Sequence, residues 1–443
     1  MLNKITAFSQ KISPNLRQII GNTGWLFTEK IVQMGLGLLV GVWITRYLGP
    51  EQFGRFNYAL AIVGLSVPFA KLGLDNIVIR NLARDPSCKN ETLGSAFALK
   101  LISSLVTLVA IVGIIFLITP NATPANQETR LLVGIVAAGT VLQSFDIIDY
   151  WFQSQVKAKY SVWARNGAYV FMSLVKIILI QVKAPLMAFA IAMVAEATLY
   201  AIGLVILYQF NGNAIKAWQV TLKYAKLLLN DSWPLILSGI VIMIYMRIDQ
   251  VMLGQMVGEK SVGIYSAAVK ISELWYFVPS AIVNSVFPSI VQAKEISEEV
   301  YYKRLQQLFN VMSVLAYSVA IPITFLSTWI VTLIYGKYYA EAAPILTVHI
   351  WTGLFVSLGV ARETWLTTEG LMKFSAATTA AGAVVNIVLN YFLIGSYGGL
   401  GAALATVAAQ FIASYGAGAF YPQTRKIFIH QTKAITLLGW FSR

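Results

Sequence analysis

Long apolar stretches alternate with short polar connections along nearly the whole chain. Each stretch is continuous, with no alternation of apolar and polar positions, and is about 20 residues long. This pattern predicts membrane-spanning helices rather than the strands of a barrel. Twelve stretches are expected, at residues 20–45, 54–75, 95–118, 131–150, 166–183, 185–208, 232–253, 262–290, 306–326, 344–361, 374–395 and 400–420. Turn-forming residues such as Leu48-Gly49-Pro50 separate neighbouring stretches.

The composition agrees with a membrane protein of 443 residues, because 57% of them are apolar and only 12% are charged. A soluble domain has roughly 45–50% apolar and about 25% charged residues. So few charges do not cover the surface of a soluble enzyme of this length. The net charge of +14 would suggest nucleic acid binding in a soluble chain. In a membrane chain it is typical of basic cytoplasmic loops, so no nucleic acid partner is expected.

The distribution of basic residues predicts the orientation of the chain in the membrane. With the N-terminus inside, alternate connections hold 21 of the 33 lysines and arginines, among them Arg165 in the connection 151–165. The opposite connections hold six, and the other six lie within the apolar stretches. Basic residues accumulate on the cytoplasmic side, which predicts a multi-pass protein with both termini in the cytoplasm. The six outer residues are Arg46, Arg55, Arg130, Lys183, Lys260 and Lys337.

Two segments have apolar residues at helical spacing with lysines between them. One is the N-terminal arm, residues 1–19, and the other is the connection 209–231, in which Trp218 and Leu222 share a face. Either segment suits a helix that lies flat on an anionic inner leaflet. The alternative is an ordinary solvated loop.

An internal repeat relates the two halves of the chain. Asn22-Thr-Gly-Trp25 matches Asn230-Asp-Ser-Trp233 at an offset of 208, and the segment that begins Phe53-Gly54 matches the one that begins Val262-Gly263 at an offset of 209. A repeat unit of six spans is even, so both halves have the same orientation in the membrane. We therefore expect two pseudo-symmetric six-helix bundles around a central cavity. The expected parts are a cytoplasmic amphipathic arm at 1–19, bundles at 20–208 and 232–420, a cytoplasmic linker at 209–231 and a basic cytoplasmic tail at 421–443.

Two motifs resemble those of bacterial lipid-linked oligosaccharide flippases. They are Trp43-Ile-Thr-Arg46-Tyr-Leu-Gly49-Pro-Glu51-Gln-Phe-Gly54 and Lys71-Leu-Gly73-Leu-Asp75-Asn-Ile-Val-Ile-Arg80-Asn-Leu-Ala83-Arg84. These flippases are the O-antigen and polysaccharide transporters of the multidrug/oligosaccharidyl-lipid/polysaccharide exporter superfamily. The resemblance implies that the protein flips undecaprenyl-diphosphate-linked oligosaccharides across the bacterial inner (plasma) membrane by alternating access, with ion coupling possible. It also implies membrane lipids, a polysaccharide polymerase and chain-length regulators as partners.

Ionisable residues inside the spans are the candidate site, because burying charge in hydrocarbon is costly and such residues mark substrate or ion pathways. Basic groups in a central cavity would neutralise a diphosphate, and amides and carboxylates would line the cavity. The diphosphate candidates are Lys30, Lys71, Arg247 and Lys270; the ion-coupling candidates are Glu29, Asp75 and Asp249; the cavity-lining candidates are Gln143, Asp146, Asp149, Asn386 and Asn390.

Simpler explanations exist for several charged residues. Lys71 with Asp75, and Lys270 with Glu273, are spaced to form ion pairs within a helix. Lys100 is expected to extend its ammonium group toward the inner interface. Asp146 and Asp149 resemble a catalytic carboxylate pair, but no nucleophile or metal-ligand motif accompanies them.

Cofactors and metals are not expected. Cys88 is the single cysteine, and the two histidines, His349 and His430, are too far apart in the sequence to suggest a zinc site. Two other functions stay open. One is a multidrug or metabolite exporter of the same superfamily, and the other is a membrane-embedded glycan polymerase. The polymerase would show a long outer loop or a D-x-D-type metal site beside a soluble domain, and the sequence has neither.

Overall fold

The computed structural model describes residues 14–121 and 123–437, with side chains from residue 21 onward. The part of the chain described forms α-helices joined by short 3₁₀ turns, without a strand. The helices of the first half are α2 (Pro14–Lys71), α3 (Asp75–Arg84), α4 (Lys89–Ile118), α5 (Pro124–Leu142), α6 (Asp146–Ser154), α7 (Lys159–Gln181) and α8 (Leu186–Phe210). Those of the second half are α9 (Leu222–Met256), α10 (Glu259–Glu273), α11 (Phe277–Ile296), α12 (Glu298–Tyr335), α13 (Ala342–His349), α14 (Thr352–Thr368), α15 (Met372–Ser414) and α16 (Arg425–Ile435). Most of the predicted arm 1–19 lies outside the described residues.

The predicted stretches lie in the helical parts of the chain, which confirms an all-helical membrane protein, but the stretches 54–75, 131–150, 262–290 and 344–361 each contain a break between two α-helices. Among the described residues, ten helical segments are long and apolar enough to cross a membrane. The number is ten because two segments, Gly21–Arg84 and Met372–Ala419, each contain two predicted stretches. Within them the helix breaks at Gly49 (φ 69°) and at Gly398 (φ 54°). Only glycine adopts this backbone conformation without steric cost, which explains where the two interruptions fall.

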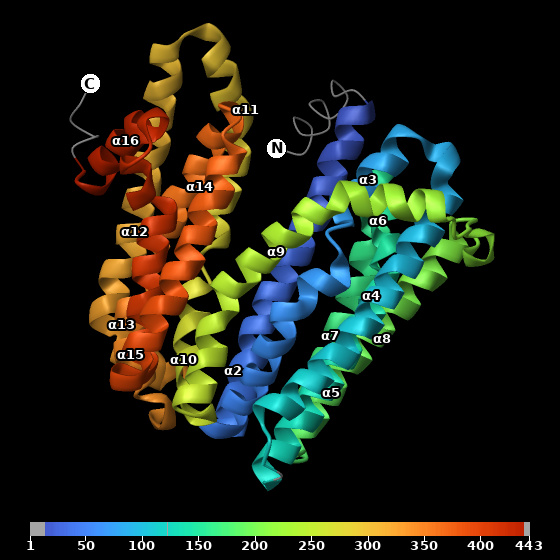
Figure 1. Ribbon diagram of the computed structural model, residues 1–443, viewed down its shortest axis with the longest axis horizontal. Helices are drawn as coiled ribbons and strands as arrows, with labels where there is room; N and C mark the ends of the chain where they lie inside the picture. The colour runs from blue at the N-terminus through green and yellow to red at the C-terminus, as the bar shows by residue number, and fades with distance from the viewer. Residues whose placement is uncertain (1–13, 122, 438–443) are drawn as a thin grey trace, which may run out of the picture. The chain divides into compact units, whose positions relative to one another are not determined.

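The chain folds into two compact units. The first contains the chain up to Tyr47 together with Ile62–Ile240, and the second contains Leu48–Ala61 and the chain from Val241 onward. In the first unit, α4, α5, α7 and α8 pack along one another (Figure 1). The segment Leu48–Ala61 is continuous with the first unit at both ends but packs with the second. The bundle bounds expected from the sequence remain a prediction.

The connection 209–231 is shorter than expected, because α9 begins at Leu222. Its remaining residues dock on the start of α4: the Gln219 amide donates to the Asn90 carbonyl at 3.0 Å, and the Thr221 amide donates to Ser95 Oγ at 3.1 Å. Trp218 packs on Phe97 with ring centroids 5.4 Å apart. Trp218 and Leu222 therefore differ in environment: Trp218 is half-buried, and Leu222 is exposed.

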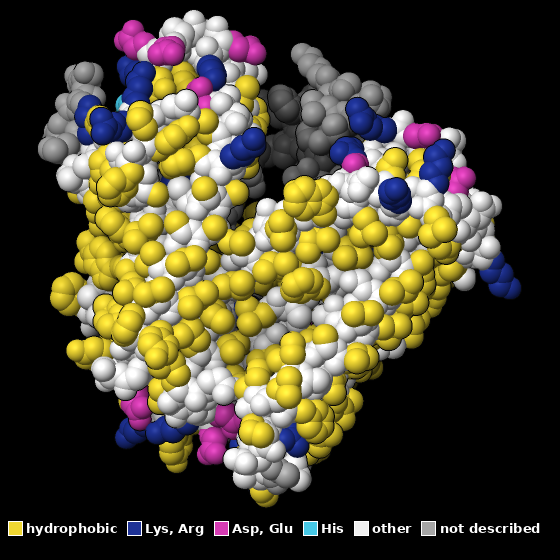
Figure 2. All heavy atoms as spheres, in the orientation of Figure 1, with side chains coloured by type: hydrophobic (Ala, Val, Ile, Leu, Met, Phe, Trp, Pro, Cys, Tyr) yellow, Lys and Arg dark blue, Asp and Glu magenta, His cyan; other side chains and the backbone are white. Residues whose placement is uncertain are grey.

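The helices expose apolar side chains along their lengths. In Figure 2, hydrophobic side chains cover the middle of the helices of each unit, whereas charged side chains gather toward the helix ends. Leu117 on α4 is 80% exposed, and Phe325 on α12 is 82% exposed. Contact with lipid tails makes such exposure favourable, so this surface is that of a multi-pass membrane protein.

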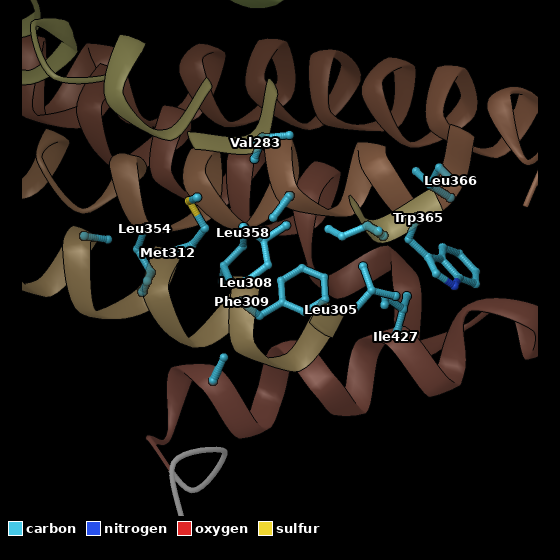
Figure 3. Close-up of a cluster of buried hydrophobic side chains, with 14 of the residues drawn as sticks. Val283, Leu305, Leu308, Phe309, Met312, Leu354, Leu358, Trp365, Leu366 and Ile427 are labelled. Carbon is cyan, nitrogen blue, oxygen red and sulfur yellow. The ribbon is translucent and has the colours of Figure 1, made fainter. Parts of the chain in front are cut away.

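The second unit has its own apolar core, which joins four helices (Figure 3). Leu305, Phe309 and Met312 of α12 meet Leu358 of α14, and Ile427 of α16 covers one side of the cluster. Val283 brings α11 to the same cluster. The contact with Ile427 fixes the predicted cytoplasmic tail onto the bundle as an ordered helix.

We expect the variant Phe309→Ala to be less stable than the parent protein. Phe309 is fully buried, and truncation of a buried Phe to Ala costs about 3–5 kcal/mol because it leaves a cavity. The measurement is the midpoint of thermal unfolding in detergent. Phe325→Ala on the same helix is the control, because Phe325 is exposed; equal midpoints for the two variants would contradict the packing described.

Candidate functional site

The predicted cavity-lining residues Gln143, Asp146 and Asp149 lie where a helix is interrupted. After α5 ends, a 3₁₀ turn at Gln143–Phe145 precedes α6. Asp146 and Asp149 fall in the first turn of α6. The unpaired amides of a helix N-terminus favour negative charge, so this break is a favourable place for two carboxylates inside an apolar bundle.

Arg165 of α7 joins Asp149 to a second carboxylate, Glu29, from another helix of the first unit. Its guanidinium lies 2.8 Å from Oε1 of Glu29 on α2 and 3.3 Å from Oδ2 of Asp149 on α6. It also donates to the Tyr200 hydroxyl on α8 and lies 4.7 Å from the centre of that ring. Both carboxylates are buried, so the guanidinium compensates for their desolvation. We call these four residues the Arg165 network.

A second polar network of the first unit contains Lys100. Its ammonium donates to the Tyr150 hydroxyl at 3.0 Å and lies 3.9 Å from Oδ2 of Asp146. Tyr150 in turn donates to Oδ1 of Asp75 at 2.6 Å. Lys100 is 1% exposed, so the expectation that its ammonium reaches the interface is wrong. Buried lysine is retained here because a carboxylate and a phenol surround it.

The second unit contains a polar cluster around Asp249 of α9. Tyr265 of α10 donates to Asp249, and the backbone amide of Gln250 donates to its Oδ1 at 2.8 Å. The Tyr265 hydroxyl lies 3.4 Å from Oγ1 of Thr406 on α15. Three helices thus place a carboxylate, a phenol and a threonine hydroxyl together.

Asn386 and Asn390 of α15 extend the same cluster. Asn386 Nδ2 lies 3.5 Å from Thr406 Oγ1, and Asn390 donates to Asn386 Oδ1 at 3.0 Å. Both amides are fully buried, and Oδ1 of Asn390 has no hydrogen-bond partner among the described residues. Leaving a buried acceptor unpaired costs roughly 1–3 kcal/mol, which marks this oxygen as available to a ligand. We call Asp249, Tyr265, Thr406, Asn386 and Asn390 the Asp249 cluster.

The four basic residues predicted to contact a diphosphate divide between the units. Lys30 on α2 is exposed, and Lys71 at the end of α2 is half-buried; both belong to the first unit. Arg247 on α9 is half-buried, and the Lys270 ammonium lies 4.4 Å from the Phe53 ring centre; both belong to the second. In the second unit, Arg247 and Lys270 lie close enough to interact electrostatically. Their role stays a prediction.

The two ion pairs considered within single helices do not form. Asp75 accepts from Tyr150, and Lys71 lies beyond ion-pair distance from it, since α2 ends at Lys71 and α3 begins at Asp75. Lys270 lies over Phe53, without a Glu273 contact among the described ion pairs. Lys176 and Glu196, in contrast, pair at 2.6 Å between α7 and α8.

Sequence reasoning missed Arg165, Tyr150, Tyr200, Tyr265 and Thr406 as members of these groups. Arg165 was assigned to a cytoplasmic connection, but it lies in the second turn of α7. Among the described residues there is no group of three or more His, Cys, Asp or Glu side chains arranged to hold a metal ion. His349 Nδ1 forms a hydrogen bond with Ser272 Oγ at 2.8 Å, which joins α13 to α10.

Comparison with known proteins identifies the family. A family model described as "Polysaccharide biosynthesis protein" matches residues 19–294, more than half of the chain. The chain belongs to the polysaccharide biosynthesis protein family. A second model, MatE, matches residues 234–392 of this family member.

Relatives of this polysaccharide biosynthesis protein cover most of its length. The "Capsular polysaccharide biosynthesis protein CapF" of Staphylococcus aureus is 19% identical and aligns with 91% of this chain and 99% of its own. The "Probable low-salt glycan biosynthesis flippase Agl15" of Haloferax volcanii is 23% identical over 86% of this chain and 79% of its own. Both are named for biosynthesis or flipping of glycans.

Two solved structures share the fold at low identity. The lipid II flippase MurJ, in an inward closed conformation, has a TM-score of 0.69, 15% identity and coverage of 95% of this chain and 91% of its own. A multidrug resistance MATE family transporter in an inward-facing conformation also has a TM-score of 0.69, with 16% identity and coverage of 93% and 96%. These neighbours and the named flippases are transport proteins, not enzymes, as the sequence predicts.

We expect Arg165→Gln to destabilise the protein, because Glu29 and Asp149 would lose their shared cation. A broken buried pair costs about 3–5 kcal/mol, and because the Arg165 side chain is 35% exposed we expect roughly 2 kcal/mol. Thermal unfolding in detergent measures the change. Lys30→Gln removes one positive charge from an exposed site of the same unit and should have no effect.

The triple variant Glu29→Gln, Asp149→Asn and Arg165→Gln separates charge compensation from packing. Without the carboxylates there is no uncompensated charge, so this variant should regain part of the stability lost by Arg165→Gln. A further loss in the triple variant would contradict the role assigned to Arg165.

Proposed function

We propose that this protein flips undecaprenyl-diphosphate-linked oligosaccharide units from the inner to the outer leaflet of the bacterial plasma membrane. The observation that carries the proposal is the polysaccharide biosynthesis family match over residues 19–294, in a chain whose helices expose apolar surface along their lengths. The flippase names of relatives that align with most of the chain support the same substrate class. The product would supply surface polysaccharide or O-antigen synthesis.

The proposed mechanism is alternating access by two bundles. The repeat at an offset of 208–209 residues, with the same orientation for both halves, supports it. A diphosphate carries several negative charges, so Lys30, Lys71, Arg247 and Lys270 are proposed to contact it as the lipid passes. Membrane lipids surround the protein, and a polysaccharide polymerase and chain-length regulators are the proposed partners that use the product.

The proposed location is the bacterial inner membrane with both termini in the cytoplasm. The excess of basic residues in alternate connections supports this orientation. The connection between α8 and α9, with Lys216, and the first turn of α9, with Lys223, then face the anionic inner leaflet.

A multidrug exporter is the alternative function, because a MATE transporter shares the fold. Fold similarity at 16% identity does not separate the two functions, since the flippase MurJ has the same TM-score. The polysaccharide family model matches a larger part of the chain than MatE does, and this favours the flippase.

We expect purified protein in liposomes to move a fluorescent undecaprenyl-diphosphate-linked oligosaccharide between leaflets. The assay follows loss of fluorescence to a membrane-impermeant quencher, and protein-free liposomes give the background. A deletion strain should accumulate the lipid-linked repeat unit on the inner leaflet. Transport of a cationic dye with no movement of the glycolipid would instead support an exporter.

The variant in which Lys30, Lys71, Arg247 and Lys270 are all replaced by Gln tests the diphosphate contacts in the same assay. We expect at least a tenfold lower flipping rate, because each charged contact to a phosphate contributes about 1.5–3 kcal/mol. An unchanged rate would remove these residues from the proposal.

Ion coupling is proposed at the Asp249 cluster. Hard cations such as Na⁺ prefer oxygen ligands, and the cluster offers a carboxylate, two hydroxyls and the unpaired amide oxygen of Asn390. The Asp249 carboxylate forms no ion pair among the described residues, unlike Glu29 and Asp149, so its charge is available to a cation. Of the other two coupling candidates, Glu29 is paired with Arg165, and Asp75 accepts from Tyr150, which in turn accepts from the Lys100 ammonium.

Asp249→Asn should abolish any dependence of flipping on a cation gradient and lower the gradient-driven rate at least tenfold. The measurement compares liposomes with inward or outward gradients of Na⁺ or of protons. Asp231→Asn is the matched control, since Asp231 lies on the same helix but is exposed and paired with Arg80. A gradient response that survives in Asp249→Asn would place coupling elsewhere.

A further inference from the structure

The first unit contains a pocket that the proposed transport function does not use. Its volume is about 300 Å³, and it lies where the start of α2 meets the connection between α6 and α7. Asn22 and Trp25 form its α2 side, and Lys157, Lys159 and Tyr160 form the opposite side. The volume falls at the lower end of the range for small-molecule sites, roughly 300–1,000 Å³. We call it the α2–α7 pocket.

A strained turn at the end of α6 leads into the pocket. Val156, which also lines the pocket, has φ 54°. The Lys157 amide donates to the Phe152 carbonyl at 2.9 Å, and the Val156 amide donates to the Gln153 carbonyl at 3.0 Å. This pair of bonds is the Schellman arrangement, in which glycine usually occupies the position of Val156. A β-branched residue adopts positive φ only at a steric cost, and such strain is typical of functional sites.

The turn is fixed against α2 and brings two lysines to the pocket. The Ala158 amide donates to Oδ1 of Asn22 at 2.7 Å. Lys157 is exposed and Lys159 is half-buried, and neither forms an ion pair among the described residues. The next acidic residue along α2, Glu29, is already paired with Arg165 at 2.8 Å.

The backbone adds to the positive charge of the lysines. The α2–α7 pocket lies at the N-terminus of α7, a helix of 23 residues whose N-terminal residue Ala158 provides no side-chain cap. The first amides of a helix have no partner within it and favour negative charge. No Asp or Glu lines the pocket. The pocket is therefore suited to an anion.

Aromatic rings indicate the depth of the pocket in the membrane. Trp25 packs edge-on against Trp163, and Trp163 packs edge-on against Tyr160, each with ring centroids 6.0 Å apart. The Lys159 ammonium lies 4.8 Å from the centre of the Tyr160 ring. Trp, Tyr and Lys are typical of the membrane–water interface, where a side chain contacts both apolar and polar surroundings. This depth favours a lipid headgroup as the anion.

An exposed apolar stripe on α7 continues from the pocket along the helix. Its large side chains recur at helical spacing: Trp163, Val170, Phe171, Leu174 and Ile178. Gly167 lies within the stripe, and a Cβ atom there would meet nothing within 4 Å, so the surface is open at this point. From Trp163 to Ile178 the helix rises about 22 Å, which exceeds half of the hydrocarbon core of about 30 Å. The stripe is long enough to contact the chains of a lipid.

We propose that the α2–α7 pocket binds the headgroup of an anionic phospholipid, with the lipid chains along the α7 stripe. Lys157 and Lys159 pair with the phosphate, and the rings of Trp25 and Tyr160 flank it. Basic pockets between transmembrane helices are typical sites for phosphate-bearing headgroups. The bound lipid joins α2 to α7 and so stabilises the first unit. The inference requires only a bilayer that contains anionic lipid, so it does not depend on the flippase function.

Lipid binding to the purified full chain in detergent tests the inference. Phosphatidylglycerol and phosphatidylcholine are titrated separately, and native mass spectrometry counts the retained lipid. We expect at least tenfold tighter binding of phosphatidylglycerol, because the choline group cancels the charge of the phosphate. Bound phosphatidylglycerol should also raise the midpoint of thermal unfolding. Equal affinities for the two lipids would overturn the proposal.

The variant Lys157→Gln with Lys159→Gln should bind phosphatidylglycerol at least tenfold more weakly and lose the shift in midpoint. The matched control is Lys216→Gln with Lys226→Gln, which removes two exposed lysines of the same unit that do not line the pocket. We expect the control to stay within twofold of the parent affinity. Equal losses in the two variants would show attraction by net charge alone, and this would overturn the site.

Val156→Gly separates binding from stability. Glycine adopts positive φ without strain, so the lipid-free midpoint should rise or stay equal. The turn loses its side chain and its restriction, so we expect at least threefold weaker binding of phosphatidylglycerol. A merely structural role would leave the affinity unchanged, and that result would remove the turn from the site.

Two competitors identify the source of the phosphate. Inorganic phosphate at the concentration of the lipid should neither displace phosphatidylglycerol nor raise the midpoint, because it lacks chains for the α7 stripe. Undecaprenyl-diphosphate-linked oligosaccharide at that concentration should also leave the lipid bound. Displacement by phosphate would indicate a site for a free anion, and displacement by the glycolipid would assign the pocket to substrate; either result would overturn the proposal. Failure of the protein to flip glycolipid in liposomes would contradict only the proposed function.

Discussion

The structure depends on the need of every backbone amide and carbonyl to find a hydrogen-bond partner where no water is present. In the hydrocarbon of a membrane, a helix satisfies all of these groups within one segment. The described chain is helical almost throughout. The same constraint limits where a helix can be interrupted. The breaks at Gly49 and Gly398 use the conformational freedom of glycine, and the break before α6 is followed by carboxylates that suit a helix N-terminus.

Charge is treated differently in the two units. In the first, Arg165 lies between two carboxylates and Lys100 lies between a carboxylate and a phenol, so buried anions have a basic neighbour. In the second, Asp249 accepts hydrogen bonds from a phenol and a backbone amide, and Arg247 acts on it electrostatically without an ion pair among the described residues. The first arrangement compensates buried carboxylates with basic side chains, whereas the second stabilises a buried carboxylate mainly through hydrogen bonds. Two units related by an internal repeat have thus kept the fold and diverged in the polar groups it contains.

The sequence predicts the helices better than it predicts the partners of their polar side chains. Apolar stretches of about 20 residues follow directly from bilayer thickness, so they locate the helices, but they do not show the breaks inside stretches such as 131–150. Arg165 shows the limit: a charged residue at the edge of an apolar stretch looks like part of a loop until its carboxylate partners from α2 and α6 are known. Lys100 was misplaced for the same reason, because the phenol and carboxylate that keep it buried come from distant parts of the chain. Spacing within one helix predicted a Lys71–Asp75 pair, but the end of α2 at Lys71 removes that helix.

Gly54 of α2 and Gly263 of α10 each lie against the other's helix, and this reciprocal contact has an evolutionary consequence. In a symmetric dimer, a residue i of one subunit that contacts residue j of the other is matched by j contacting i. Gly54 on the Glu259 carbonyl and Gly263 on the Pro50 carbonyl are such a matched pair within a single chain. This is the arrangement expected if a six-helix ancestor assembled as a homodimer before gene duplication and fusion. The two glycines would then descend from one residue that packed beside its own copy on the symmetry axis.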